Sequence, residues 1–421
     1  MSAGLSPLGR LKETVRPYYL RWAYFPLHPQ RRPASFQDCW RYPYQKLGEA
    51  ARLPESASHL PDLIFYPMTD WHTRIQRTQH LARAFAALGH RVLCLNPHLG
   101  REFESTRLLD PSHRLSRLEE NVYELHIRLP REPVFHERLL SPVEERIVAE
   151  AVSQALPRGA RAVQILSFPL WSGVARQFRE ESAFPLLYDC HDLLSGFGNI
   201  AKPLIAAEEA LLETADLVLF SSQGLMDRYP AVRKSRLVRN AVSAAMFRAA
   251  AAPPARMVAG YVGALDSWFD MEAVQQAAIS HPDCRFVIAG RVEYEPIHRL
   301  RELSNVEMPG EIPYHRVPEL LAGFRAALIP FRINPLTLMT NPIKLYEYFS
   351  CGLPVVSTPL PEMQTMAGLV YLGETPMDFA REVGRALAED DPPRRARRRE
   401  IAQQESWSAR ARDIQAEFEG L

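Results

Sequence analysis

The chain has 421 residues, of which 47% are hydrophobic and 24% charged, and its formal net charge at pH 7 is +1. This length exceeds what one hydrophobic core usually serves, so it predicts two domains. The small net charge argues against a nucleic-acid-binding protein, because no excess of basic residues is available to replace phosphate counterions. No segment approaches the ~18 consecutive apolar residues of a membrane-spanning helix.

The cysteines are scattered, odd in number and without a CxxC pair, at Cys39, Cys94, Cys190, Cys284 and Cys351. This usage is typical of a reducing cytoplasm and speaks against a zinc site or a disulfide framework. We therefore expect a soluble protein of the cytoplasm.

Residues 1–58 differ from the rest and are predicted to form an N-terminal extension. Residues 1–52 hold nine Lys or Arg against three Asp or Glu, with nine aromatic residues. One interpretation is an arm packed on the first domain. The other is a basic and aromatic patch at the inner face of an anionic membrane, where each basic residue near the lipid contributes about 1 kcal/mol. The first is favoured slightly, since no amphipathic helix is evident.

Residues 59–250 alternate short apolar runs with amphipathic segments and predict an N-terminal α/β domain. Strands are expected in "LPDLIFYP", "HRVLCLNP", "NVYELHIRLP", "RAVQILSFPL", "PLLYDCHD" and "DLVLFSS". A helix is expected in "TDWHTRIQRTQHLARAFAALG", capped by Thr69 or Asp70 and ending at Gly89. This spacing favours a doubly wound parallel sheet.

A second alternating set occupies residues 251–403, after the linker-like stretch "RAAAAPPAR". Strands are expected in "MVAGYVGAL", "CRFVIAGRV", "VEMPGEI", "AALIPF", "LPVVSTPL" and "GLVYLG", with helices near 270–280, 316–324, 342–350 and 376–389. The basic run Arg394–Arg399 is interpreted as a solvated helix start. Residues 404–421 predict a final helix capped by Ser406. Ligands of such sheets bind outside the carboxyl ends of the strands, so the site is expected between the two domains.

The segment "NPIKLYEYFSCGLPVVSTPLPE", residues 341–362, carries the strongest chemical signal. Asn341 is expected to cap a helix that stops at Gly352. A helix N-terminus offers backbone N–H groups and a positive dipole to a phosphate. Lys344 and Glu347 share one face, so they could receive a diphosphate and a ribose. The alternative is a solvated ion pair worth only ~0.2–0.5 kcal/mol.

The segment resembles the donor-binding signature of GT-B glycosyltransferases, "E-x-x-x-x-G-x-P-V-V", from Glu347 through Gly352 to Val356. It is similar to that of bacterial polysaccharide glycosyltransferases, including the glucuronosyltransferases of xanthan-type assembly. "GYVGALDSWFD", "FVIAGRV", "PGEIP" and "ALIPFR" precede it in the expected order, and "ESWSARARDIQ" resembles the helix that crosses back to the first domain. The resemblance is clearest from Met257 onward and implies two Rossmann-like domains facing a cleft.

The resemblance also implies roles for residues of the second domain. Gly263 and Leu265 would let the backbone approach the donor phosphates, and Arg291 could reach a phosphate. Glu311 would sit beside the base and Phe331 would form its wall. Lys344 would hold the diphosphate and Glu347 the ribose.

Two positions depart from the common retaining pattern. Met339 stands where that pattern has a glutamate, eight positions before Glu347. "ALDSWFD" stands where it has an arginine and a lysine, whose charge Lys344 could supply. The donor sugar and the choice between inversion and retention stay open.

Three titratable groups, Asp189, His191 and Asp192, follow a strand of the first domain in "YDCHDLLSGFGN". An inverting transfer needs a base for the acceptor hydroxyl. The glucuronosyltransferase likeness implies an aspartate, and Asp192, with His191 beside it, fits best. The alternative is that Asp192 caps the following loop and His191 is a satisfied strand-end residue.

The acceptor side is predicted at the helix of "TDWHTRIQRTQHLARAF". Trp71 could stack on a sugar, Arg77 could meet an acceptor phosphate, and His80 is predicted to bind the acceptor beside them. An exposed amphipathic helix explains the same residues nearly as well.

These features predict a metal-independent glycosyltransferase that uses a nucleotide-sugar donor, expected to be UDP-linked, and a glycan or lipid-linked acceptor in polysaccharide or cell-envelope synthesis. No metal or other cofactor is expected, because no DxD-like pair lies near the signature. The rival hypotheses are a catalytically silent nucleotide- or partner-binding scaffold and a nucleotide-sugar 2-epimerase, which would be expected to show a glutamate and arginine set that is not found.

Overall fold

The computed structural model describes residues 49–50, 52–54, 59–72, 74–99, 113–129, 135–247, 254 and 256–420. Residues 46–421 form one compact unit, and all structural statements below concern its described part. The predicted extension, residues 1–58, lies almost entirely outside the described residues.

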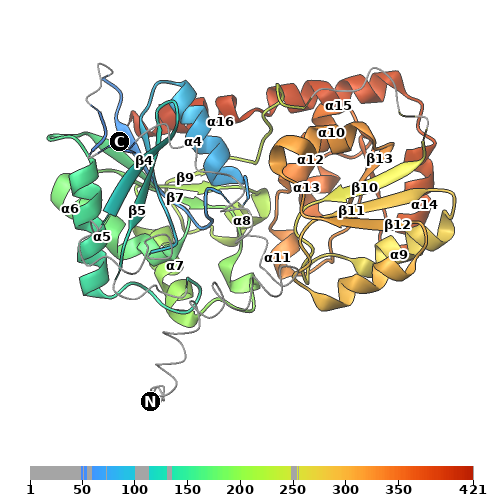
Figure 1. The fold of residues 1–421 in the computed structure, drawn as a ribbon, viewed down its shortest axis with the longest axis horizontal. Helices are drawn as coiled ribbons and strands as arrows, with labels where there is room; N and C mark the ends of the chain where they lie inside the picture. Colours follow the sequence, from blue (N-terminus) through green and yellow to red (C-terminus); the bar gives the residue numbers. More distant parts are fainter. Residues whose placement is uncertain are drawn as a thin grey trace, which may run out of the picture. The chain divides into compact units, whose positions relative to one another are not determined.

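The first sheet has nine strands in the order β1-β4-β5-β3-β2-β6-β7-β8-β9 (Figure 1). Their bounds are β1 Glu49–Ala50, β2 Asp62–Tyr66, β3 Val92–Leu95, β4 His113–Glu119, β5 Val122–Ile127, β6 Ala162–Leu166, β7 Leu186–Cys190, β8 Leu217–Phe220 and β9 Ser235–Leu237. The six predicted strands are confirmed. The sheet is mixed rather than wholly parallel, because β4 runs antiparallel to β5 and β1 antiparallel to β4.

Each face of this sheet is covered by its own core cluster. Alternate side chains of one strand point to opposite faces, so they belong to different clusters. Ile64 and Tyr66 of β2 belong to one core cluster, and Leu63 and Phe65 to the other. The helices of this part are α4 Arg77–Ala87, α5 Pro142–Ala155, α6 Ser172–Ser182, α7 Lys202–Thr214 and α8 Gln223–Arg228.

Helix α4 begins later than the sequence predicts. Gln76 occupies its N-cap position, and the side chains of Gln76 and Gln79 satisfy the backbone N–H groups there. Asp70 instead accepts a hydrogen bond from the backbone N–H of His72 (2.6 Å), which stabilises a turn before the helix. The predicted caps Thr69 and Asp70 are therefore wrong.

The second sheet has six parallel strands in the order β12-β11-β10-β13-β14-β15. Their bounds are β10 Val258–Val262, β11 Arg285–Ala289, β12 Val306–Gly310, β13 Ala326–Ile329, β14 Val355–Ser357 and β15 Val370–Leu372. All six were predicted. The chain winds outward in both directions from β10 and β13, and the carboxyl ends of these two strands mark the place where such sheets bind ligands.

The helices around the second sheet are α9 Met271–Ser280, α10 Val317–Ala322, α11 Pro335–Leu338, α12 Ile343–Ser350, α13 Pro361–Gln364, α14 Pro376–Leu387 and α15 Pro392–Gln404. Helix α15 corrects the interpretation of the basic run. Arg398 is fully buried and forms two hydrogen bonds to Glu389, at 2.6 and 2.7 Å. Arg394 donates to the carbonyl oxygen of Gly368. The run is thus partly a buried ion-pair network rather than a wholly solvated surface.

The last helix, α16 Trp407–Phe418, returns to the first sheet, where it packs against α4 (Figure 1). Ser406 caps it as predicted, accepting from the backbone N–H of Ala409 at 3.2 Å. Its buried side chains Trp407, Ile414 and Phe418 join the same core cluster as Phe85 of α4. The return of the C-terminal helix is therefore confirmed.

None of the described helices combines the length and the hydropathy that crossing a membrane requires.

Candidate functional site

Helix α12 and Gly263 meet at the central edge of the second sheet. Gly263 follows β10, and α12 lies in the connection between β13 and β14. The helix starts at Ile343, with Pro342 at the N-cap position and no side-chain cap. Asn341 is therefore not the cap that the sequence predicts. Gly352 ends the helix with φ +72°, in the left-handed region, as expected.

Lys344 is half-buried beside two aromatic rings. Its ammonium nitrogen is 5.5 Å from the centre of the Tyr261 ring and 5.9 Å from that of the Phe331 ring. Burial lowers the pKa of Lys344, while Glu347 acts to raise it. Phe331 is nearly covered and lines this cation site. A cation held close to aromatic faces and away from bulk water interacts strongly with an anionic ligand.

Glu347 lies one turn further along α12 and is 6% exposed. Its Oε1 accepts a hydrogen bond from the Tyr314 hydroxyl at 2.8 Å. Burial raises the pKa of Glu347, opposed by this hydrogen bond and by Lys344. The helix thus presents a cation and a carboxylate on one face, as the sequence predicts.

Gly263 allows Lys344 to reach this position. A Cβ atom at Gly263 would lie 2.1 Å from Lys344 Cε, and the residue has φ +155°. The backbone N–H groups of Gly263 and Leu265 donate to the carbonyl oxygens of Ala289 (2.9 Å) and Arg291 (3.0 Å). These two groups are therefore used within the protein, and the space that a side chain at Gly263 would fill is occupied by Lys344.

Charged residues from both sheets meet beside this site. Arg74, which precedes α4, donates from Nε to Glu311 Oε1 at 2.9 Å. Its Nη2 lies 3.6 Å from Glu293 Oε1, which is 2.8 Å from Arg291 Nε. The second oxygen of Glu311 is buried without a hydrogen-bond partner. Arg291 is held by a carboxylate, and Arg74 brings a cation that the sequence analysis did not place here.

Asn341 connects the start of α12 to the first sheet. Its Oδ1 accepts from the backbone N–H of Asn240 at 2.8 Å, and its Nδ2 donates to Tyr346 and Glu362 at 3.0 Å each. Asn240 Oδ1 in turn accepts from Arg77 Nη1 at 3.2 Å. A continuous hydrogen-bonded chain therefore runs from α4 to α12.

Asp192 and His191 follow β7 at the carboxyl end of the first sheet. The Asp192 side chain is 25% exposed, and its Oδ2 lies 3.8 Å from His191 Nε2. Burial and the charge of Asp189 raise the pKa of Asp192, against the effects of His191 and Arg77. The loop that follows reaches the second sheet, where Phe197 meets Trp268 edge to face at 6.2 Å. A partly exposed carboxylate with a raised pKa suits a general base.

The three residues predicted to bind the acceptor all have covered side chains. Arg77 is 2% exposed and forms an ion pair with Asp189, with 2.9 Å between Nε and Oδ1. His80 is buried between Trp407, on which it stacks at 5.0 Å, and Tyr314 at 5.4 Å. The Arg83 guanidinium covers the Trp71 ring at 5.1 Å. The structure gives all three packing contacts within the protein rather than an open face for an acceptor.

A buried carboxyl behind the loop of Asp192 yields a stability prediction. Glu208 of α7 accepts a hydrogen bond from the Tyr188 hydroxyl at 2.8 Å, and burial raises its pKa to about 7. The folded protein thus holds a proton that the unfolded chain loses near pH 4.5, so stability falls as the pH rises from 4.5 to 7. Glu208→Gln should match the wild type below pH 4.5 and exceed it above pH 7 by ~1–3 kcal/mol. Urea unfolding at both pH values tests this, with Glu213→Gln, at an exposed position of α7, as the control.

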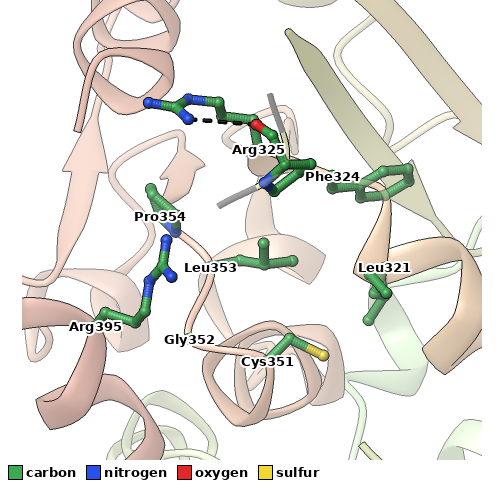
Figure 2. A pocket seen from close by; sticks show the side chains of 10 residues that line it. Leu321, Phe324, Arg325, Cys351, Gly352, Leu353, Pro354 and Arg395 are labelled. Carbon is green, nitrogen blue, oxygen red and sulfur yellow. Dashed lines mark hydrogen bonds between the residues drawn. The ribbon is translucent and has the colours of Figure 1, made fainter. Parts of the chain in front are cut away.

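One pocket lies at the opposite end of α12 from Lys344. Figure 2 shows Cys351, Gly352 and Leu353 on its wall, with Arg395 beside Gly352. Arg325 closes another side and donates to the carbonyl oxygen of Pro254 at 3.3 Å. None of the predicted donor residues lines this pocket.

Sequence reasoning missed two residues of the site. Tyr314 holds Glu347, and Arg74 pairs with Glu311 from the other sheet. A tyrosine three residues after the glutamate of "PGEIP" was visible in the sequence, but nothing local linked it to Glu347. The contact of Arg74 joins positions 237 residues apart, which no local pattern indicates.

Comparison with known proteins gives a consistent result. Residues 256–389 match the family model described as glycosyl transferases group 1. The curated protein named "Putative teichuronic acid biosynthesis glycosyltransferase TuaH", from Bacillus subtilis (strain 168), is 26% identical over 314 residues, which cover 67% of this chain and 76% of that protein.

Solved structures share the architecture. Sucrose-phosphate synthase from Thermosynechococcus elongatus superposes with a TM-score of 0.66 at 17% identity, covering 86% of this chain and 98% of that one. HepE from Anabaena, solved with UDP and glucose, gives 0.63 at 14% identity, covering 86% and 100%. At such low identity these structures establish the fold, and the predicted GT-B arrangement is confirmed.

Proposed function

Because the chain is a glycosyltransferase with the GT-B fold, we propose that it transfers a sugar from a UDP-linked donor to a glycan or lipid-linked acceptor in cell-surface polysaccharide synthesis. The observation that carries the proposal is the pairing of Lys344 and Glu347 on one face of α12, at the central carboxyl edge of the second sheet. The UDP in the HepE structure and the teichuronic acid pathway in the name of TuaH support the donor and the acceptor class.

Each donor group has a counterpart in this site. The Glu347 carboxylate, held by Tyr314, can accept hydrogen bonds from both ribose hydroxyls. Lys344 and the positive end of the α12 dipole can hold the diphosphate, and the missing side chain at Gly263 leaves the room that Lys344 occupies. Arg74 adds a second cation, whose charge acts on Lys344. It supplies part of the charge that the common retaining pattern places after the first strand of this domain.

Asp192 is the proposed base if the reaction inverts the anomeric configuration. It would take the proton of the acceptor hydroxyl as the sugar is transferred, while Lys344 stabilises the leaving diphosphate. His191 Nδ1 lies 3.0 Å from the carbonyl oxygen of Asp189, which orients the imidazole beside Asp192. If the reaction retains the configuration, these residues position the substrate.

A thermal-shift panel of UDP, GDP, ADP and TDP tests the donor assignment. UDP at 100 times its Kd should stabilise the wild type by ~2.7 kcal/mol, which corresponds to a rise of a few degrees in Tm. Glu347→Ala should abolish most of this shift, because it removes the acceptor for the ribose hydroxyls. Glu319→Ala, at an exposed position of α10, should retain it. If no nucleotide raised the Tm of the wild type, a scaffold without donor binding would replace the proposal.

A further inference from the structure

Three neighbouring strands of the first sheet each contribute an acid or amide followed two residues later by a histidine. Asp70 and His72 follow β2, Asn96 and His98 follow β3, and Glu124 and His126 lie on β5. Because β2, β3 and β5 are adjacent in the sheet, these pairs gather at one place. The reaction proposed above uses none of them.

The ligand atoms of the central members of this cluster lie close to one another. His72 Nε2 is 2.8 Å from Glu124 Oε2, and Asp70, His72 and Glu124 each offer one ligand atom, all within 4.8 Å of one another. Ligand atoms around tetrahedral Zn²⁺, at ~2.0–2.2 Å from the metal, lie roughly 3.3 Å apart. We propose that Asp70, His72 and Glu124 bind a divalent transition-metal cation of the Zn²⁺ class.

The other polar residues hold the ligands in place, as outer residues do around known metal sites. Glu124 accepts from Asn96 Nδ2 at 2.8 Å, and His126 Nε2 lies 3.0 Å from its other oxygen. His98 Nε2 lies 2.9 Å from Asp70 Oδ2. Each carboxylate of the site is thus oriented by a further side chain, and its position is fixed before a cation arrives.

The charge of the cluster also favours a cation. Asp70 is 5% and Glu124 1% exposed, so two carboxylates lie together in the interior. Buried carboxylates require a compensating charge. A divalent cation supplies it in one ion, and neutral imidazole is a normal ligand of Zn²⁺. A network of protonated histidines is the competing arrangement, and the experiment distinguishes the two.

The cation would secure the segment that carries Arg74. Asp70 accepts from the backbone N–H of His72, and the Gln79 side chain donates to the carbonyl oxygens of Asp70 (3.0 Å) and Arg74 (2.8 Å). Arg74 then reaches Glu311 beside the donor helix. The proposal departs from the expectation of a metal-free protein, which rested on the residues near the donor signature and on the scattered cysteines, none of which is a ligand here.

The test is Zn²⁺ binding by the purified full-length chain after chelator treatment. Isothermal titration with Zn²⁺ should show one site per chain, and Co²⁺ should give the visible absorption bands of a low-coordinate protein site. His72→Gln and Glu124→Gln should each weaken Zn²⁺ binding at least tenfold. The control is His298→Gln, which removes a half-exposed histidine whose Nε2 lies 3.8 Å from Glu295 Oε2 in the second domain. This variant should bind Zn²⁺ like the wild type.

The Tm of each variant without metal shows whether the variant is folded. A variant whose metal-free Tm is near that of the wild type, but whose Tm does not rise when Zn²⁺ is added, supports the site. The proposal is overturned if the wild type binds less than one Zn²⁺ per chain, as a network of protonated histidines requires. It is equally overturned if His298→Gln weakens binding as much as His72→Gln does, which would indicate adventitious surface binding. Nucleotide binding at the α12 site is measured separately, so failure here leaves the proposed glycosyl transfer standing.

Discussion

Lys344→Met is expected to weaken UDP binding by about 30- to 150-fold, corresponding to the ~2–3 kcal/mol that a charge-assisted contact provides. The ammonium group is the cation of α12 that faces the site, and methionine retains the length of the side chain beside Tyr261 and Phe331. Since burial lowers the pKa of Lys344, removing its charge should not destabilise the free protein. Isothermal titration with UDP and the Tm of the free variant measure both effects.

The matched control is Lys202→Met, which removes an exposed lysine at the start of α7. It should bind UDP like the wild type. Wild-type UDP affinity in Lys344→Met would contradict the assignment of the diphosphate to α12. A large loss of Tm in Lys344→Met would instead indicate that the lysine supports the fold, and Lys344→Arg would then be the variant to titrate.

Asp192→Asn is expected to lower kcat by roughly 100- to 10,000-fold, the usual contribution of a general base, while UDP binding stays unchanged. Asparagine keeps the shape of the side chain but cannot take a proton. In the wild type, burial raises the pKa of Asp192, so kcat should fall as the pH drops through that raised value. The acidic limb of the pH profile should disappear in the variant.

Asp227→Asn, on the exposed surface of α8, is the control for this experiment and should keep wild-type kcat. The anomeric configuration of the product, read by NMR, determines how the result is interpreted. An inverted product with undiminished kcat in Asp192→Asn would rule out Asp192 as the base. If the product retains the anomeric configuration, Asp192→Asn should lower kcat only modestly, because a retaining transfer does not require such a base.

The buried strands were predicted from the sequence, whereas half-exposed strands of the first sheet were missed. Strands such as β2 and β13 are short apolar runs buried on both faces, which makes them distinct in the sequence. Strand β4, "HRLSRLE", was missed because its residues are mostly polar and half-exposed. It pairs antiparallel with β5 and is only half-buried, so its sequence does not show the continuous apolar run of a strand that is buried on both faces.

Helix α12 was predicted because the signals for it are local, whereas the residues that surround it were not predicted. Lys344 and Glu347 are three residues apart, and Gly352 marks the end of the helix. Asn341 was mistaken for a cap because its partners Asn240 and Glu362 are distant in sequence and close only after folding. His80 and Arg77 were mistaken for surface residues for the same reason, since Trp407 and Asp189 cover them.

The return of α16 to the first sheet has a consequence for synthesis of the chain on the ribosome. The face of α4 that carries Leu81 and Phe85 needs Trp407, Ile414 and Phe418 to complete its cluster. The ribosome makes these residues only after the entire second sheet. Until then, apolar surface on α4 stays open to chaperones or to misassociation with other nascent chains. A stalled or truncated product that lacks the last turns of the chain should therefore be recognised as unfinished in its first half, although the defect lies at its end.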